Sequence, residues 1–143
     1  MVWLLRFYFI FMGLIYFAIG AWAILSHISF LEAVGLKIAS DIGLSEIGGI
    51  YGGLNICIGI MCFVGMFKQN IGIFAVQFLT FLTGSIAFGR ILSSFMPSMP
   101  TFLNSFFIFE VCAYLVGIFI LANKNKSEYI TKVLNIKNIT SYK

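Results

Sequence analysis

The stretch Glu46–Gly59 reads Glu-Ile-Gly-Gly-Ile-Tyr-Gly-Gly-Leu-Asn-Ile-Cys-Ile-Gly and concentrates the unusual residues of an otherwise apolar chain. It holds five glycines, one carboxylate, one tyrosine and one asparagine. At about 3.6 residues per helical turn, small residues gather on one side, where a second helix can approach closely. The glycines predicted to make this packing contact are Gly48, Gly49, Gly52, Gly53 and Gly59.

The composition indicates that lipid, and not water, surrounds most of the chain. Hydrophobic residues make up 61% of the 143 residues, charged residues only 10%, and the mean hydropathy is +1.04. Soluble domains carry about 25% charged residues, so a water-facing surface of the usual kind is excluded. A very apolar soluble protein is the alternative. We therefore predict an integral membrane protein.

Four apolar segments are long enough to cross a bilayer, which takes about 20 helical residues. They cover residues 7–25, 47–67, 71–92 and 101–122. The first segment has a rival interpretation as a signal peptide, because Ala21-Trp22-Ala23 resembles a cleavage site, but a signal core has only about 7–15 apolar residues. Lys68-Gln69-Asn70 predicts a tight turn, and Pro97 and Pro100 interrupt the helix before the last span.

The region between the first two spans mixes charged and apolar residues. Apolar residues recur at helical spacing within residues 26–45 and predict a short amphipathic helix at the membrane surface, with a polar loop as the alternative. The predicted fold class is therefore all-α, an integral membrane four-helix bundle with a short amphipathic helix between the first and second spans. Residues 1–122 form the transmembrane domain, and residues 123–143 a basic tail that is either amphipathic or solvated.

Two spans carry further contact faces. On the first span, small and aromatic residues at steps of three and four predict a groove for another helix: Gly13, Tyr16, Gly20, Ala23 and His27. On the third span, a polar seam contains Thr80, Thr83, Ala87, Arg90 and Ser94.

Two charges inside the predicted spans are expected to meet. At ~1.5 Å per residue, Arg90 lies about 6 Å and Glu110 about 14 Å below the turn, and an arginine side chain bridges that difference. A charge at this depth is costly unless it is paired. Glu46 lies at the same side of the membrane and competes for Arg90. We predict a buried cluster of Glu46, Arg90 and Glu110, with Tyr51 and Asn55 as hydrogen-bond partners, that is either structural or a ligand site.

The basic residues predict an orientation. Four spans place both termini on one side, together with Arg6, Lys68 and the five lysines of the tail. The opposite side carries only Lys37 and Arg90. Because basic residues favour the cytoplasmic side, we expect both termini to be cytoplasmic.

The sequence predicts no catalytic residue, no metal ligand set and no cofactor. His27 is the single histidine, and Cys57, Cys62 and Cys112 form no Cys-x-x-Cys motif. Nucleophile-elbow, phosphate-loop and zinc-protease motifs do not occur. We therefore expect a protein that is not an enzyme. The charge is local to a membrane edge, so nucleic acid is not an expected partner.

The chain resembles a bacterial family of small four-helix membrane proteins, the domain of unknown function DUF4345. The residues that carry the resemblance are Ser45-Glu46-Ile47, Tyr51-Gly52-Gly53-Leu54, Gly59, Gly89-Arg90-Ile91-Leu92-Ser93 and Glu110. In that family an arginine often follows the first glutamate by two positions. Here Gly48 stands there, so the resemblance leaves Arg90 as the cation for Glu46. A looser likeness to DoxX-type membrane proteins concerns architecture only.

Two function classes remain. The first is a non-catalytic accessory subunit or helical scaffold, surrounded by membrane lipids, that packs against itself as a homo-oligomer or joins a larger membrane complex. The alternative is a binder or carrier of a small or lipophilic molecule in a cleft near Arg90. The resemblance implies an architecture and no activity.

Overall fold

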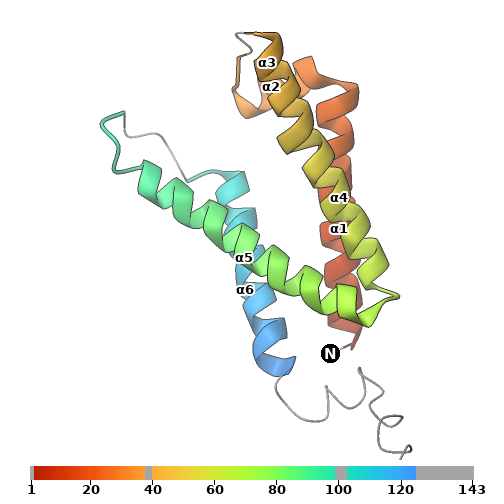
Figure 1. Cartoon of the computed structure of the whole chain (residues 1–143). Helices are drawn as coiled ribbons and strands as arrows, with labels where there is room; N and C mark the ends of the chain where they lie inside the picture. Colours follow the sequence, from red (N-terminus) through yellow and green to blue (C-terminus); the bar gives the residue numbers. More distant parts are fainter. Residues whose placement is uncertain (1, 38–39, 99–102, 125–143) are drawn as a thin grey trace, which may run out of the picture. The chain divides into compact units, whose positions relative to one another are not determined.

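The structure is a computed structural model that describes residues 2–37, 40–98 and 103–124 (Figure 1). In chain order its helices are α1 (Val2–Leu25), α2 (His27–Val34), α3 (Asp41–Glu46), η1 (Ile47–Gly53), α4 (Leu54–Gly65), α5 (Gln69–Ser93) and α6 (Ser105–Lys124). No strand occurs among these described residues. The chain divides into a first unit, Met1–Gly72, and a second unit, Ile73–Lys143, and each is described by itself.

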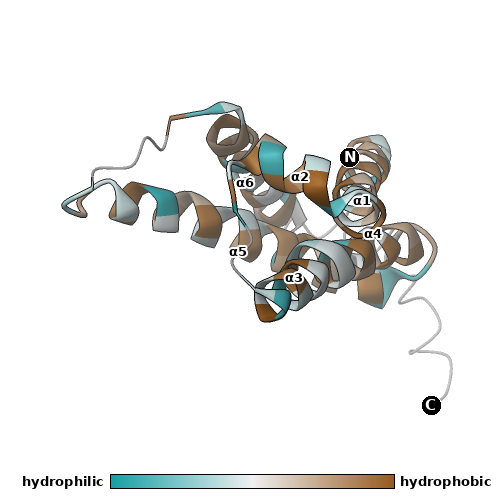
Figure 2. Ribbon diagram, turned by 90° about the horizontal axis from the view of Figure 1, so that it is seen from above, coloured by the Kyte–Doolittle hydropathy of each residue, from teal (hydrophilic) through white to brown (hydrophobic). Residues whose placement is uncertain are grey.

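The all-α class and the four long apolar helices are confirmed. Helices over Trp3–Leu25, Asp41–Gly65, Gln69–Ser93 and Ser105–Asn123 are long and apolar enough to cross a membrane. Apolar residues dominate these helices in Figure 2. The predicted tail, residues 123–143, lies almost entirely outside the described residues.

The second long helix begins earlier than predicted, at Asp41 and not at Ile47. Its N-terminus is capped by Ser40, whose hydroxyl oxygen accepts a hydrogen bond of 3.3 Å from the Gly43 amide. The prediction placed its start too late because Asp41 was assigned to the surface segment, residues 26–45. The predicted turn Lys68-Gln69-Asn70 is also shorter, since Gln69 and Asn70 belong to the first turn of α5.

The predicted amphipathic helix exists as α2, although α2 covers only part of residues 26–45. It ends at Gly35, which adopts the left-handed conformation with φ 72°. Glycine takes this conformation without a steric penalty and ends helices for that reason. Phe30 and Leu31 of α2 are buried. The Trp22 ring of α1 packs edge-on against Phe30 at 5.5 Å between centroids, which ties α2 to α1.

In the first unit, α1 and α4 lie side by side through glycine (Figure 1). A Cβ at Gly20 would stand 2.7 Å from the carbonyl oxygen of Gly52, and a Cβ at Gly59 would stand 2.9 Å from the backbone nitrogen of Phe17. A Cβ atom essentially never lies this close to a backbone atom, so glycine is the residue that fits at both positions. The groove predicted on the first span is therefore filled by the second long helix.

The second long helix is a π-helix over Ile47–Gly53, where the glycines are densest. Within η1 the backbone bonds reach five residues back, as the Leu54 amide does to the Gly49 carbonyl. Where the backbone hydrogen bonds change back from a five-residue to a four-residue spacing, one carbonyl is left without a backbone amide donor. At this junction the Asn55 side-chain amide donates to the carbonyls of Tyr51, at 2.8 Å, and Ile50, at 3.2 Å. The asparagine thus satisfies the backbone where the helix changes type.

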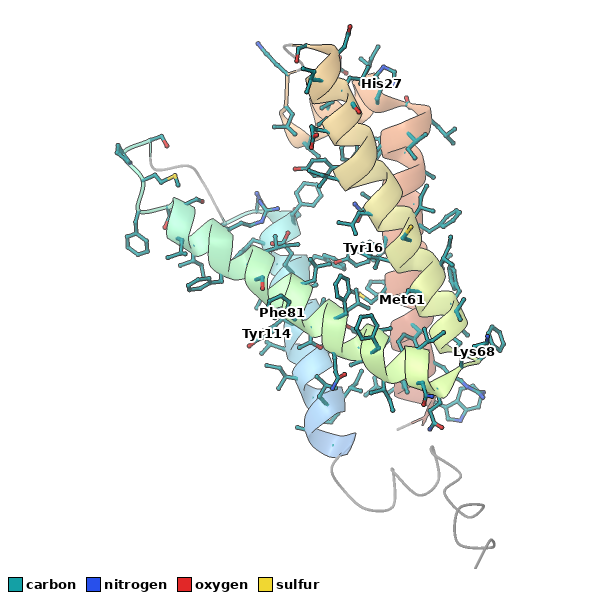
Figure 3. All side chains as sticks on the ribbon, viewed as in Figure 1. Tyr16, His27, Met61, Lys68, Phe81 and Tyr114 are labelled. Atoms are coloured by element: carbon teal, nitrogen blue, oxygen red, sulfur yellow. The ribbon has the colours of Figure 1, made fainter. Side chains whose placement is uncertain are left out.

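In the second unit, α5 and α6 pack through side chains as well as glycines. Tyr114 of α6, labelled in Figure 3, lies over Gly84 of α5, where an added Cβ would stand 2.7 Å from its ring. Gly117 of α6 lies directly against the side chain of Thr80. These contacts fix the two helices next to each other and position the charged residues described below.

Candidate functional site

Arg90 of α5 and Glu110 of α6 form a bidentate ion pair. Arg90 Nε donates to Glu110 Oε2 at 2.8 Å, and Arg90 Nη2 donates to Glu110 Oε1 at 3.0 Å. Parallel bonds of this kind are the strongest geometry available to an arginine and a carboxylate. The Glu110 side chain is 10% exposed and that of Arg90 is 34% exposed. The predicted meeting of these two charges is confirmed.

Local sequence explains why the two side chains reach each other. Asn104 Oδ1 accepts a hydrogen bond from the Phe107 amide at 3.0 Å, which caps α6 and places Glu110 in its second turn. Arg90 lies in the last turn of α5, where the partial negative charge of the helix end favours a cation. Ser93 Oγ donates to the Arg90 carbonyl at 2.8 Å and satisfies a backbone acceptor at the same helix end.

The threonines of the third span bond within their own helix. Thr80 Oγ1 donates to the Val76 carbonyl at 2.7 Å, and Thr83 Oγ1 donates to the Leu79 carbonyl at 2.8 Å. Both threonines are buried. Their hydroxyl protons are therefore already used within α5, and the Thr80 hydroxyl oxygen also lies directly against Gly117 of α6.

The other three members of the predicted cluster lie in the first unit. The Tyr51 ring packs against the Phe30 ring at 5.5 Å between centroids, and the Asn55 amide donates to the Tyr51 carbonyl of its own helix. Glu46 is exposed at the start of η1, without an ion-pair partner among the described residues of its own unit. Since each unit is described by itself, the part of Glu46 in a cluster with Arg90 stays a prediction.

The five predicted packing glycines differ in their surroundings. Gly52 lies against Ile24 of α1, and Gly59 lies against Phe17 and the Gly13 carbonyl. Added Cβ atoms at Gly48 and Gly49 would meet nothing within 4 Å among the described residues, and one at Gly53 would meet only the Gly48 carbonyl. A packing role of Gly48, Gly49 and Gly53 stays a prediction.

Sequence reasoning missed a polar network at the α1–α2 corner. Trp22 Nε1 donates to Ser29 Oγ at 2.8 Å, and the hydroxyls of Ser26 and Ser29 are hydrogen-bonded at 2.9 Å. Two serines three residues apart, just after a tryptophan at a span end, were the available signal. Among the described residues, no group of three or more His, Cys, Asp or Glu side chains is placed to hold a metal ion.

The fold and the ion pair define a class of protein: all-helical, with four helices of membrane-spanning length and an arginine–glutamate pair that joins the last two. Residues 4–121 match the model of the family described as Domain of unknown function (DUF4345). The chain belongs to this family, which confirms the resemblance seen in its glycine stretch, its Gly89-Arg90 pair and Glu110. No curated protein and no solved structure matches the chain.

Proposed function

We propose that this chain is an integral protein of the bacterial cytoplasmic membrane that acts as a non-catalytic helical scaffold or accessory subunit. The observation that carries this proposal is the bidentate geometry of the Arg90–Glu110 pair. Each carboxylate oxygen accepts a hydrogen bond from one arginine nitrogen. A carboxylate held in this way is neutralised by its partner. It joins two helices.

Three other polar side chains on the long helices are likewise used internally. Asn55, Thr80 and Thr83 all donate to carbonyls of their own helices. Glycines bring α1 and α4 to backbone contact. These polar side chains and glycines therefore support helix structure and packing, which is the property expected of a scaffold.

The membrane orientation is tested by labelling engineered cysteines in intact cells. Asp41→Cys lies at the start of the second long helix, and Lys68→Cys lies at the turn before α5, at the opposite end of that helix. With cytoplasmic termini, a membrane-impermeant maleimide added from the periplasm labels Asp41→Cys and not Lys68→Cys. The reverse pattern would contradict the proposed orientation, and equal labelling would contradict membrane placement.

The scaffold role is tested by the protein mass, without bound detergent, of the particle that contains the chain after gentle detergent extraction. We expect a protein mass larger than the 16.0 kDa of one chain. The variant Arg90→Leu with Glu110→Leu should keep this particle, because it removes both charges and leaves apolar side chains between α5 and α6. Loss of the particle in that double variant, or a wild-type chain that is entirely monomeric, would contradict the scaffold role.

A binder of a small anionic or amphiphilic molecule is the second candidate. Arg90 is one-third exposed, and its Nη1 nitrogen makes no hydrogen bond to Glu110. An anionic group at this free edge would be held by a charge-assisted bond. Native mass spectrometry of the wild type and of Arg90→Lys tests for such a ligand. A ligand that binds the planar guanidinium should be lost in the lysine variant. Identical adducts in both proteins would count against a ligand at Arg90.

A further inference from the structure

One side of α5 is exposed along the length of the helix. Phe74, Phe81 and Phe88 recur every seven residues on this side and are 58%, 74% and 61% exposed. Phe81 is labelled in Figure 3. Gln77, Ser85 and Gly89 lie within the same arc and are exposed as well. We refer to the surface formed by Phe74, Gln77, Phe81, Ser85, Phe88 and Gly89 as the α5 face.

Gln77 is the residue of the α5 face that needs a partner. It lies eight residues after Gln69, the first residue of a helix of 25 residues, and therefore about 12 Å from the helix end at ~1.5 Å per residue. Its side-chain amide has no hydrogen bond to any described residue. An amide at this depth in hydrocarbon, without water or a partner, is unfavourable, and such residues characteristically bond across helix–helix contacts.

We propose that the α5 face binds the α5 face of a second copy of this chain, with the two Gln77 amides hydrogen-bonded to each other. This proposal names one partner for the scaffold proposed above and rests on its membrane placement. Two copies inserted in the same orientation, related by a two-fold axis along the membrane normal, place identical residues at identical depth. A carboxamide carries both a donor and an acceptor, so it is complementary to its own copy.

The remaining residues of the face fit a parallel helix pair. Phenylalanines at a seven-residue spacing keep to one seam of two helices that wind around each other. Small residues at Ser85 and Gly89, four residues apart, let the backbones approach, and a Cβ at Gly89 would meet nothing within 4 Å. A carboxamide within a largely apolar seam fixes the register of such a pair. Gln77 occupies that position here.

The test is cysteine cross-linking in native membranes. The exposed Cys57 and Cys112 are replaced by alanine, and the fully buried Cys62 is kept. Ser85→Cys then probes the α5 face. Leu115→Cys is the matched control, because Leu115 is an exposed residue of α6 at a similar distance from the same end of the second unit. We expect Ser85→Cys to form a disulfide-linked dimer at least about fivefold more efficiently than Leu115→Cys.

A second variant tests the amide itself. Gln77→Leu, measured by energy transfer between labelled copies in vesicles of defined lipid-to-protein ratio, should weaken dimerisation roughly 3- to 15-fold, the range typical of polar contacts between membrane helices. Unchanged dimerisation in Gln77→Leu would overturn the amide pairing. Cross-linking of Ser85→Cys no better than Leu115→Cys would overturn the α5 face as the interface.

These outcomes separate the self-pairing from the scaffold role. A particle larger than one chain that shows no α5 cross-link contradicts the self-pairing alone and leaves another partner for the scaffold. An α5 cross-link in a chain whose particle is lost on joint replacement of Arg90 and Glu110 contradicts the scaffold role and supports the self-pairing.

Discussion

The two units hold their helices together by different kinds of contact. In the first unit, α1 and α4 meet backbone to backbone, as at Gly59, where an added Cβ would lie 3.0 Å from the Gly13 carbonyl oxygen. In the second unit, α5 and α6 meet through side chains, with Tyr114 over Gly84 and Arg90 bonded to Glu110. The first contact depends on the missing side chains of glycines. The second also contains glycines, Gly84 and Gly117, but each lies against a particular side chain of the other helix.

This difference determines how each unit responds to mutation. Backbone atoms of two packed helices cannot move aside separately, so an extra carbon between α1 and α4 must separate the helices. Side chains such as Tyr114 have rotamers to exchange. The charged pair is costly in another way, because removal of one partner leaves the other without compensation.

The largest effect is expected from Gly59→Leu in the first unit. Even a Cβ would lie 2.8 Å from the Phe17 Cβ, and three further carbons have no space. We expect a loss of about 3 kcal/mol or more in the free energy of unfolding, at or above the usual range for overpacking. Gly49→Ala in the same unit, whose added Cβ meets nothing within 4 Å among the described residues, is the control and should be neutral or slightly stabilising. Equal thermal unfolding of the two variants in detergent would break the comparison.

The next effect is expected from Arg90→Leu in the second unit. It leaves the Glu110 carboxylate, 10% exposed, without its cation. Loss of one partner of a fully buried pair costs about 3–5 kcal/mol, and we expect about 2–3 kcal/mol here because Arg90 itself is one-third exposed. Lys68→Leu removes an exposed cation at a turn and should stay within about 0.5 kcal/mol of wild type. Chemical unfolding in mixed micelles measures both.

A smaller loss is expected from Asn55→Leu, at the junction of the π-helix and α4. The Tyr51 and Ile50 carbonyls each lose a side-chain donor. One unsatisfied backbone acceptor costs about 1–3 kcal/mol, so a loss of about 1–2 kcal/mol should appear in the same unfolding assay. Ile60→Leu, an exchange at an exposed position of α4, is the control. A stability equal to that of the control would show that the π-helix does not need the asparagine.

The smallest effect is expected from Gly84→Ala. The added Cβ meets only the ring of Tyr114, 36% exposed, which can rotate outward. We expect a loss of about 1 kcal/mol. A loss as large as that of Gly59→Leu would show that the second unit is as rigid as the first, and the contrast between the units would then fail.

Much of this architecture was predictable because membrane helices leave strong signals. Apolar length predicted four spans, and the glycine groove on the first span was correctly expected to accept another helix. The distances of Arg90 and Glu110 from the proline turn also predicted that these charges meet. Each of these predictions depends on composition or spacing along the chain, which a sequence displays directly.

Other features were not predictable by the same means. A helical wheel assumes the α-helical period, so it could not show that the stretch Ile47–Gly53 forms a π-helix. Within it, an added Cβ at Gly52 would meet Ile24 of α1, whereas added Cβ atoms at Gly48 and Gly49 would meet nothing within 4 Å among the described residues. The earlier start of the second helix depended on the Ser40 cap, which polar neighbours concealed.

A double-mutant cycle on Arg90 and Glu110 tests most directly the claim that this pair is a structural link between α5 and α6. The stabilities of Arg90→Leu, Glu110→Leu and the double variant are measured by unfolding in one detergent. We predict that the double variant is more stable than the sum of the single losses implies, with a coupling of about 1–3 kcal/mol. Additivity within about 0.5 kcal/mol would contradict the claim, since it would mean that the two charges do not stabilise each other.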